Sequence, residues 1–341
     1  MAQDARKRAL AAVAAAGLTL GLIPSSGLAH LRGEAERPSA ALRAGLSHPQ
    51  EQGEARIRVT TSLTLVEATV RDRRGHVLGE LTQDDFRVYE DGAEQKIAHF
   101  SRDEIPLAVA MVLDLSGSIE PFLGPLRYAS MSSLKALKEE DRVALFTFTS
   151  DVERRVELTR DKRAVSDEFE SLRAGGGTNI NDAVYLAARY LAEQAPAARR
   201  VILLVSDNKA TDRGGVSPSD VTRAVLEADA AVYSAKVPGR NPVNLSLSFG
   251  GGRVDVEKLV EETGGEMFDV RKEGSMYGAL KKVIDRLKTR YTLGYVPPTP
   301  GDGKFHRLEV KLGGDAARQS GGHTIVSKKG YYGTRQATAT N

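Results

Sequence analysis

Apolar residues follow two patterns in this chain, and the change from one to the other divides the sequence. Between Ile105 and Arg290, short apolar runs alternate with amphipathic segments. The runs are Leu107–Leu113, Val143–Phe148, Val201–Ser206, Ala231–Val237 and Met267–Val270. The segments with helical spacing are Leu126–Lys138, Lys162–Leu172, Asn181–Gln194, Pro218–Ala228, Asp255–Thr263 and Ser275–Lys288. Continuous apolar runs are typical of strands buried on both faces, so this alternation predicts an α/β fold with a doubly wound, mostly parallel sheet.

The segments on either side of this region read as short strands. The first flank holds Arg58–Val70, Phe86–Tyr89 and Gln95–Phe100, and the second holds Tyr291–Val296, His306–Leu312 and Thr324–Ser327. Asp91-Gly92 predicts a hairpin between the last two strands of the first flank, and Thr82 is expected to cap a short turn through Asp85. Each flank is too small to be stable alone. We therefore expect residues 56–102 and 291–333 to pack together as one small all-β module.

The N-terminus has the layout of an export signal. A basic cluster, Arg6-Lys7-Arg8, precedes the apolar stretch Ala9–Ile23, and Gly27-Leu28-Ala29 offers small residues for cleavage. Residues 1–29 are thus a predicted signal peptide, which places the protein in the periplasm or outside the cell. An uncleaved membrane anchor is the alternative, although the stretch is short for a span. No other segment could cross a membrane.

Two further stretches lack periodicity. Residues 30–55 are rich in Ala, Arg, Glu, Gly and Pro, and residues 334–341 are small and polar. Such compositions cannot bury enough apolar surface to fold, so the first is a predicted disordered linker and the second a disordered tail.

Charge and cysteine content exclude several functions. The chain of 341 residues has a formal charge of +3, and removing residues 1–29 takes away Arg6, Lys7, Arg8 and Asp4 and leaves +1. This balance gives no electrostatic case for nucleic-acid binding. The absence of cysteine excludes thiol catalysis and disulfides.

Three polar segments are expected to meet at one edge of the sheet. Asp114-Leu115-Ser116-Gly117-Ser118 follows the first apolar run directly, Asp207 follows the third, and Thr178 lies in a glycine-rich loop before a helix. Open α/β sheets bind ligands at the carboxyl ends of their strands. Two carboxylates and three hydroxyls are hard oxygen ligands, which suit Mg²⁺ or Mn²⁺ rather than Zn²⁺. The predicted metal ligands are Asp114, Ser116, Ser118, Thr178 and Asp207.

This set of five residues resembles the metal-ion-dependent adhesion site of von Willebrand factor type A domains. The resemblance covers about residues 105–290. The whole chain is similar to a bacterial, acidobacterial-type subfamily of these domains, through the segment Gly79–Gly92, the strand Tyr291–Tyr295 and Gly330-Tyr331-Tyr332. One departure is Asn208, where the family often has glycine. We expect this departure to affect the shape of the loop more than metal binding.

The resemblance implies a mode of action. Ser116, Ser118 and Thr178 would be hydroxyl ligands, and Asp114 and Asp207 would act mainly through water. Neutral inner ligands leave the ion much of its positive charge, so one of its waters can give way to an Asp or Glu carboxylate of a protein or peptide partner.

Neighbouring features allow more than one interpretation. Asn179 and Asn181 could orient the Thr178 loop, but helix capping is the simpler explanation. Glu120 could border a second cation, although a solvated helix start is simpler. The long polar loop 238–252 follows a strand and should lie on the metal edge, as a partner contact or as an insertion.

Two other functional classes compete with metal-dependent binding. The first is an enzyme, but all six histidines lie outside residues 105–290, and the chain has no Gly-x-Ser-x-Gly elbow and no phosphate loop. We therefore predict that the protein is not an enzyme. The second is a scaffold of an envelope complex in which the metal is structural and the β-module makes the contacts.

Overall fold

The computed structural model describes residues 63–102, 104–211, 215–239, 252–314, 316 and 322–333. The predicted signal peptide (1–29), linker (30–55) and tail (334–341) lie outside the described residues, as does most of the loop 238–252. Within the described part of the chain, no helix is both long and apolar enough to cross a membrane.

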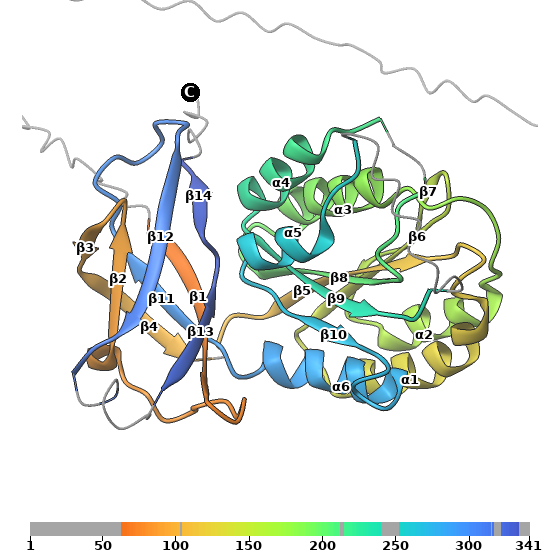
Figure 1. Cartoon of the computed structure of the whole chain (residues 1–341), viewed down its shortest axis with the longest axis horizontal. Coiled ribbons are helices and arrows are strands. Elements are labelled where there is room, and N and C mark those ends of the chain that lie inside the picture. The colour runs from red at the N-terminus through yellow and green to blue at the C-terminus, as the bar shows by residue number, and fades with distance from the viewer. Residues whose placement is uncertain are drawn as a thin grey trace, which may run out of the picture. The chain divides into compact units, whose positions relative to one another are not determined.

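A six-stranded sheet forms the centre of the α/β region (Figure 1). Its strand order is β10-β9-β8-β5-β6-β7, and every neighbouring pair is parallel except β6 and β7. The strands are β5 (Leu107–Asp114), β6 (Arg142–Phe148), β7 (Val152–Thr159), β8 (Arg199–Ser206), β9 (Ala230–Lys236) and β10 (Met267–Asp269). The predicted doubly wound, mostly parallel sheet is confirmed.

Helices cover both faces of this sheet (Figure 1). They are α1 (Leu123–Lys135), preceded by the 3-10 turn η2 (Glu120–Phe122), α2 (Lys162–Ser171), α3 (Ile180–Gln194), α4 (Pro218–Glu227), α5 (Val256–Glu262) and α6 (Met276–Leu287). Alternate residues of β5 point to opposite faces. Val109 and Met111 pack with α1, α2 and α6, whereas Ala108 and Ala110 pack with α3, α4 and α5. This two-sided burial explains the continuous apolar run of β5.

The edge strand β7 was not predicted. It carries the sequence Val-Glu-Arg-Arg-Val-Glu-Leu-Thr, pairs antiparallel with β6 and has no fully buried residue. Charged side chains are common on edge strands because they discourage pairing with other chains. The same charges hide the strand from a search for apolar runs.

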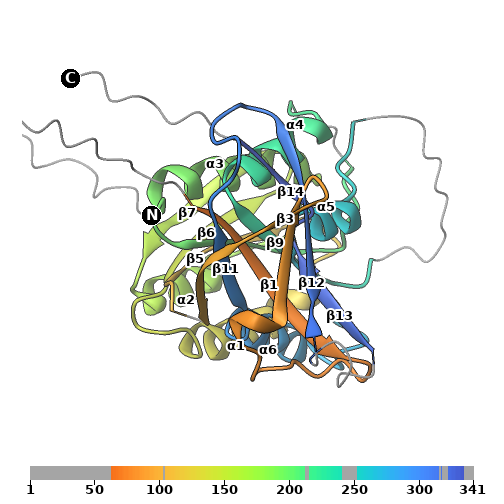
Figure 2. The same ribbon diagram turned by 90° about the vertical axis from the view of Figure 1, so that its left-hand side faces the viewer.

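The two flanks form a β-module of two four-stranded sheets, which Figure 2 shows from its own side. One sheet has the order β13-β1-β11-β4 and the other β14-β12-β2-β3. Their strands are β1 (Thr64–Asp72), β2 (Phe86–Glu90), β3 (Ala93–Gln95), β4 (Ile97–Arg102), β11 (Tyr291–Tyr295), β12 (Phe305–Leu312), β13 (His323–Ser327) and β14 (Gly330–Tyr332). Each sheet mixes strands from both flanks, and one apolar core lies between the sheets. The predicted packing of the two flanks is confirmed.

The hairpin at Asp91-Gly92 differs from its prediction. Both residues have positive φ, as the turn requires, but the strand that the turn joins to β2 is only the short β3. The predicted strand Gln95–Phe100 divides at Lys96, and its second part, β4, pairs with β11 in the other sheet. The predicted cap is confirmed, since both the backbone N–H and the hydroxyl of Thr82 donate to Asp85.

Candidate metal site at the carboxyl edge of the sheet

Asp114 is the last residue of β5 and its side chain is fully buried. Its Oδ1 accepts a hydrogen bond of 2.7 Å from the Ser116 backbone N–H, and its Oδ2 accepts one of 2.7 Å from the Ser206 hydroxyl. The carboxylate therefore shapes the loop that follows it. In that loop the hydroxyl oxygens of Ser116 and Ser118 lie 2.9 Å apart. The first three predicted ligands form one compact group.

The loop that carries Thr178 is tied to this group through its backbone. Gly175 donates to the carbonyl oxygen of Leu115 over 2.6 Å, and Asn179 donates to that of Thr149 over 2.8 Å. Gly175 and Gly176 have φ of 155° and 102°, and a Cβ on Gly176 would press against Thr149. Glycine is thus required at position 176 for close approach of the loop. Thr178 itself is buried.

Asp207 follows β8, which is hydrogen-bonded directly to β5. Its Oδ1 accepts from the Lys209 N–H over 3.0 Å. The same loop holds Thr211, whose hydroxyl accepts from the Thr178 N–H over 2.8 Å and whose N–H donates to the Thr178 carbonyl oxygen over 3.1 Å. All three predicted segments therefore meet at the carboxyl edge of β5 and β8.

The charge of this edge suits a cation. Burial raises the pKa of Asp114, the hydrogen bonds from Ser206 and Ser116 oppose the rise, and the nearby Asp207 adds to it, leaving the pKa above its ordinary value. Positive charge near these two carboxylates would therefore be stabilising. The donor set fits Mg²⁺ or Mn²⁺, which prefer hard oxygen ligands.

Asn208 adopts a left-handed conformation with φ of 60°. Asparagine tolerates this region better than most residues, and glycine adopts it freely. The Asn208 side chain exchanges hydrogen bonds with the Ser234 hydroxyl at 3.1 and 3.2 Å. The backbone at Asn208 therefore has a positive φ that glycine would also adopt.

Asn179 and Asn181 have different roles. Asn179 is the N-cap of α3, since its Oδ1 accepts from the Asp182 N–H. Asn181 is fully buried and is not a cap: its Nδ2 donates to the carbonyl oxygens of Val216 and Gly252, each over 2.8 Å, and its Oδ1 accepts from the Val254 N–H. Capping is therefore the wrong explanation for Asn181, which holds two loops beside α3.

The sequence did not reveal Ser206 or Thr211 as part of this arrangement. Each acts through atoms far away in sequence, so no local spacing marks it. The loop 238–252 begins as expected beside the site, because a Cβ on Gly239 would lie 3.1 Å from Oδ2 of Asp207. Residues 240–251 lie outside the described residues.

A second group of possible metal ligands lies in the β-module, where Glu90, Asp91 and His306 come together. Both ring nitrogens of His306 are already engaged, Nδ1 with Asp91 at 2.9 Å and Nε2 with Asp302 at 3.0 Å. Glu90 accepts hydrogen bonds from the hydroxyls of Tyr295 and Tyr331. These hydrogen bonds engage the polar atoms of the group without a metal, so we interpret it as a structural hydrogen-bond network.

Comparison with known proteins agrees with this geometry. Residues 109–209 match the family model of the von Willebrand factor type A domain. The chain therefore contains a von Willebrand factor type A domain. A segment of 153 residues, 40% of this chain, is 31% identical to inter-alpha-trypsin inhibitor heavy chain 4 of Mus musculus, of which it spans only 16%. The metal site and the bacterial subfamily stay predictions.

Solved structures resemble this von Willebrand factor type A domain at low sequence identity. An aerotolerance-related membrane protein of Bacteroides fragilis is 19% identical, with a TM-score of 0.41, over 53% of this chain and 98% of its own. A von Willebrand factor type A protein of Catenulispora acidiphila is 12% identical, with a TM-score of 0.42, over 82% of this chain and 76% of its own.

Proposed function

We propose that this protein is a non-catalytic, metal-dependent binding module that recognises an acidic residue of a protein partner. The observation that supports this proposal is the meeting of Asp114, Ser116, Thr178 and Asp207 at one edge of a von Willebrand factor type A domain. Such domains generally serve in protein interaction and adhesion.

The residues at this edge would have different roles in metal binding. Ser116, Ser118 and Thr178 would hold Mg²⁺ or Mn²⁺ through neutral hydroxyls, while Asp114 and Asp207 would act through water. The bound ion supplies positive charge for a partner carboxylate. Asp114 and Ser206 fix the loop geometry, and the burial of Asp114 and Thr178 keeps bulk water from these groups.

We further propose export to the periplasm or the cell exterior, with cleavage near Ala29. The basic cluster and the apolar stretch of residues 1–29 support it. Mass spectrometry of the protein from its native host should find a terminus near residue 30. An intact Met1 or Ala2 terminus would instead indicate a membrane-anchored form.

Metal binding is tested first without any partner. A ligand at a hundred-fold excess over its dissociation constant stabilises the native state by about 2.7 kcal/mol. For a domain of this size each kcal/mol raises the melting temperature by about 2–4 °C. We expect saturating Mg²⁺ to raise melting by several degrees in the wild type and hardly at all in Asp114→Asn.

Asp141→Asn is the matched control. Asp141 is also buried, and its carboxylate accepts from the backbone N–H groups of Leu107 and Lys138 near the other end of β5. This variant loses the same charge but should respond to Mg²⁺ like the wild type. An equal response of Asp114→Asn and the wild type would contradict the assigned site.

Partner binding is tested by capture from an envelope extract with and without EDTA. We expect EDTA and Asp114→Asn each to abolish capture, and Asp141→Asn to retain it. A scaffold with a structural metal is the second candidate, supported by the β-module with a core of its own. Capture that survives EDTA and Asp114→Asn would reject the adhesion mechanism and favour the scaffold.

A further inference from the structure

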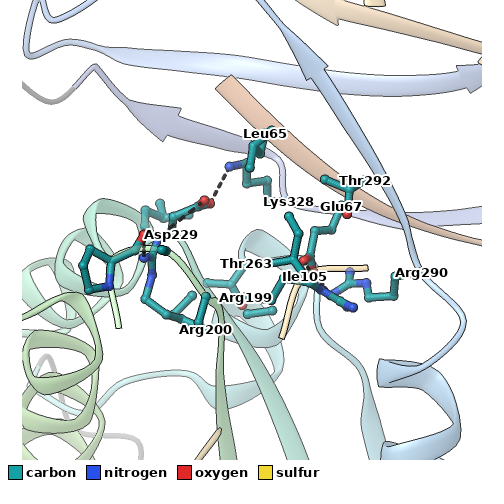
Figure 3. Close-up of a pocket in the computed structure, with 16 residues that line it drawn as sticks. Leu65, Glu67, Ile105, Arg199, Arg200, Asp229, Thr263, Arg290, Thr292 and Lys328 are labelled. Carbon is teal, nitrogen blue, oxygen red and sulfur yellow. Dashed lines mark hydrogen bonds and ion pairs between the residues drawn. The ribbon is translucent and has the colours of Figure 1, made fainter. Parts of the chain in front are cut away.

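A cavity of about 130 Å³ lies where the β-module meets the start of β8, at the amino edge of the parallel sheet (Figure 3). We call it the junction cavity. Its charged lining comes from both parts of the chain: Glu67 and Lys328 belong to the β-module, Arg199, Arg200 and Asp229 to the α/β region, and Arg290 to the connection between α6 and β11. Because Asp114 and Asp207 mark the carboxyl edge, this cavity is separate from the metal site.

The charged lining of the junction cavity is unbalanced, with four basic and two acidic residues. Each acid is shared between two cations. Glu67 pairs with Nε of Arg199 and, at 3.1 Å, with Nη1 of Arg290. Asp229 pairs with Lys328 and, at 3.7 Å, with Arg200. Among the described residues that line the cavity, positive charges therefore outnumber negative charges by two.

Backbone carbonyl oxygens accept hydrogen bonds from other N–H groups of these arginines. Arg200 donates to Ala195 and Pro196 after α3, and Arg199 donates to Leu287 at the end of α6. These contacts are favourable at helix C-termini. Carbonyl groups are neutral dipoles, however, so they orient the guanidinium groups without removing the excess charge.

Arg290 is the most deeply buried of these cations. It is 1% exposed, and its Nη2 donates to the Gly264 carbonyl oxygen. Its Nε has no hydrogen-bond partner among the described residues. A buried donor without an acceptor is costly, and a buried charge is more so. The part of the lining that the structure describes therefore leaves the Arg290 Nε without an acceptor and holds more positive than negative charge.

We propose that the junction cavity binds a small oxyanion, of the size of phosphate or a short carboxylate. A water molecule needs only about 10–15 Å³ of such space, so the cavity has room for a larger occupant. Water could accept hydrogen bonds but could not balance the charge. An oxyanion does both, and guanidinium groups match its geometry. Because both parts of the chain line the cavity, the bound anion would also hold them together.

Calorimetric titration of the full chain with inorganic phosphate tests the proposal. EDTA keeps metal at the other edge from taking part, and chloride at matched ionic strength corrects for screening. We expect saturable binding of one phosphate, weakened at least ten-fold in Lys328→Gln. Lys281→Gln, which makes the same change on an exposed part of α6, should bind like the wild type. Acetate in a parallel titration distinguishes a carboxylate site from a phosphate site.

A second measurement reports on the wild type alone, in case Lys328→Gln fails to fold. The NMR signal of the Arg290 Nε–H, assigned by its loss in Arg290→Lys, should shift in proportion to bound anion. The proposal is overturned if neither phosphate nor acetate binds beyond the chloride control, if Lys328→Gln and Lys281→Gln bind equally, or if the Arg290 signal does not move.

Discussion

Ser206 stands directly before Asp207, and its hydroxyl connects two segments of the metal edge. It donates to Asp114 and accepts from the Asn208 N–H at 3.0 Å. Side chains that orient metal ligands typically change metal affinity by 10–100-fold when they are removed. We predict that Ser206→Ala weakens Mg²⁺ binding about ten-fold while the protein stays folded, as measured by calorimetry.

Ser130→Ala is the control for this change. Ser130 is equally buried, but it lies in α1 and its hydroxyl has no hydrogen-bond partner among the described residues. Its removal should leave Mg²⁺ affinity unchanged. Equal affinity of Ser206→Ala and Ser130→Ala would show that Ser206 does not orient the site.

His306 makes the β-module sensitive to pH. Burial alone would lower its pKa, but the hydrogen bonds with Asp302 and Asp91 outweigh that effect and raise the pKa above its ordinary 6.5. Protonated His306 therefore stabilises the fold below pH 6.5, and this contribution is lost as the pH rises through the folded-state pKa. The pKa values of Asp91 and Asp302 are lowered by the same contacts and by backbone N–H groups, so both partners stay charged down to about their ordinary 3.8.

We therefore predict that His306→Asn lowers the melting temperature most at pH 5–6. The difference in melting temperature from the wild type should shrink as the pH rises further and the wild-type imidazole loses its proton. Melting curves across this range check the prediction. A difference that grows with pH would mean that His306 is neutral in the folded protein.

At the scale of elements, two glycines show how position decides the effect of one methyl group. A Cβ on Gly265, between α5 and β10, would overlap the carbonyl oxygen of Val232 in β9. Gly124 lies in the first turn of α1 with no atom within 4 Å of its Cβ position. We predict that Gly265→Ala destabilises the protein by more than about 3 kcal/mol, and that Gly124→Ala stabilises it by about 0.5–1 kcal/mol. Urea unfolding of the two variants measures both changes in stability, and similar effects would contradict the close approach of Gly265 to Val232.

The elements differ in how well the sequence predicts them. The central strands β5 and β8 were predictable because burial on both faces leaves a continuous apolar run. The strands β7 and β14 were not, because one is a charged edge strand and the other has only three residues. The break between β3 and β4 at Lys96 could not be predicted either, because it arises from the pairing of β4 with β11 in the other sheet.

In the candidate site, too, local patterns could be predicted and contacts between distant segments could not. Asp114 and Asp207 could be placed at one edge from strand order alone, because the carboxyl ends of parallel strands meet there. The contacts of Asn181 with Val216, Gly252 and Val254 join segments 35, 71 and 73 residues away. No pattern in the sequence marks which loop a buried amide will reach.

At the scale of the whole molecule, buried and half-buried ion pairs help to join the β-module to the α/β region. Glu266, beside β10, pairs with Arg71 of β1 at 2.8 Å and with Arg286 of α6 at 3.5 Å. It repeats the arrangement of Glu67 and Asp229, in which one acid serves cations on different elements. Buried ion pairs contribute little net stability, but removal of one partner is costly because it leaves the other charge buried and uncompensated. These acids should therefore couple the unfolding of the two parts.

Glu67 offers the sharpest test of this coupling. Burial raises its pKa, but Arg199 and Arg290 outweigh that effect and hold the pKa below its ordinary 4.5. Its contribution is therefore present above pH 4.5 and lost as the pH falls through the folded-state value. We predict that Glu67→Gln costs about 3 kcal/mol at pH 7, and that calorimetric melting then divides into two transitions. Glu309→Gln, an exposed change on β12, should melt like the wild type. The difference in unfolding free energy between Glu67→Gln and the wild type should become smaller as the pH falls below 4.5. If Glu67→Gln instead melts in a single transition at pH 7, at the wild-type temperature, then apolar contacts and not Glu67 couple the two parts.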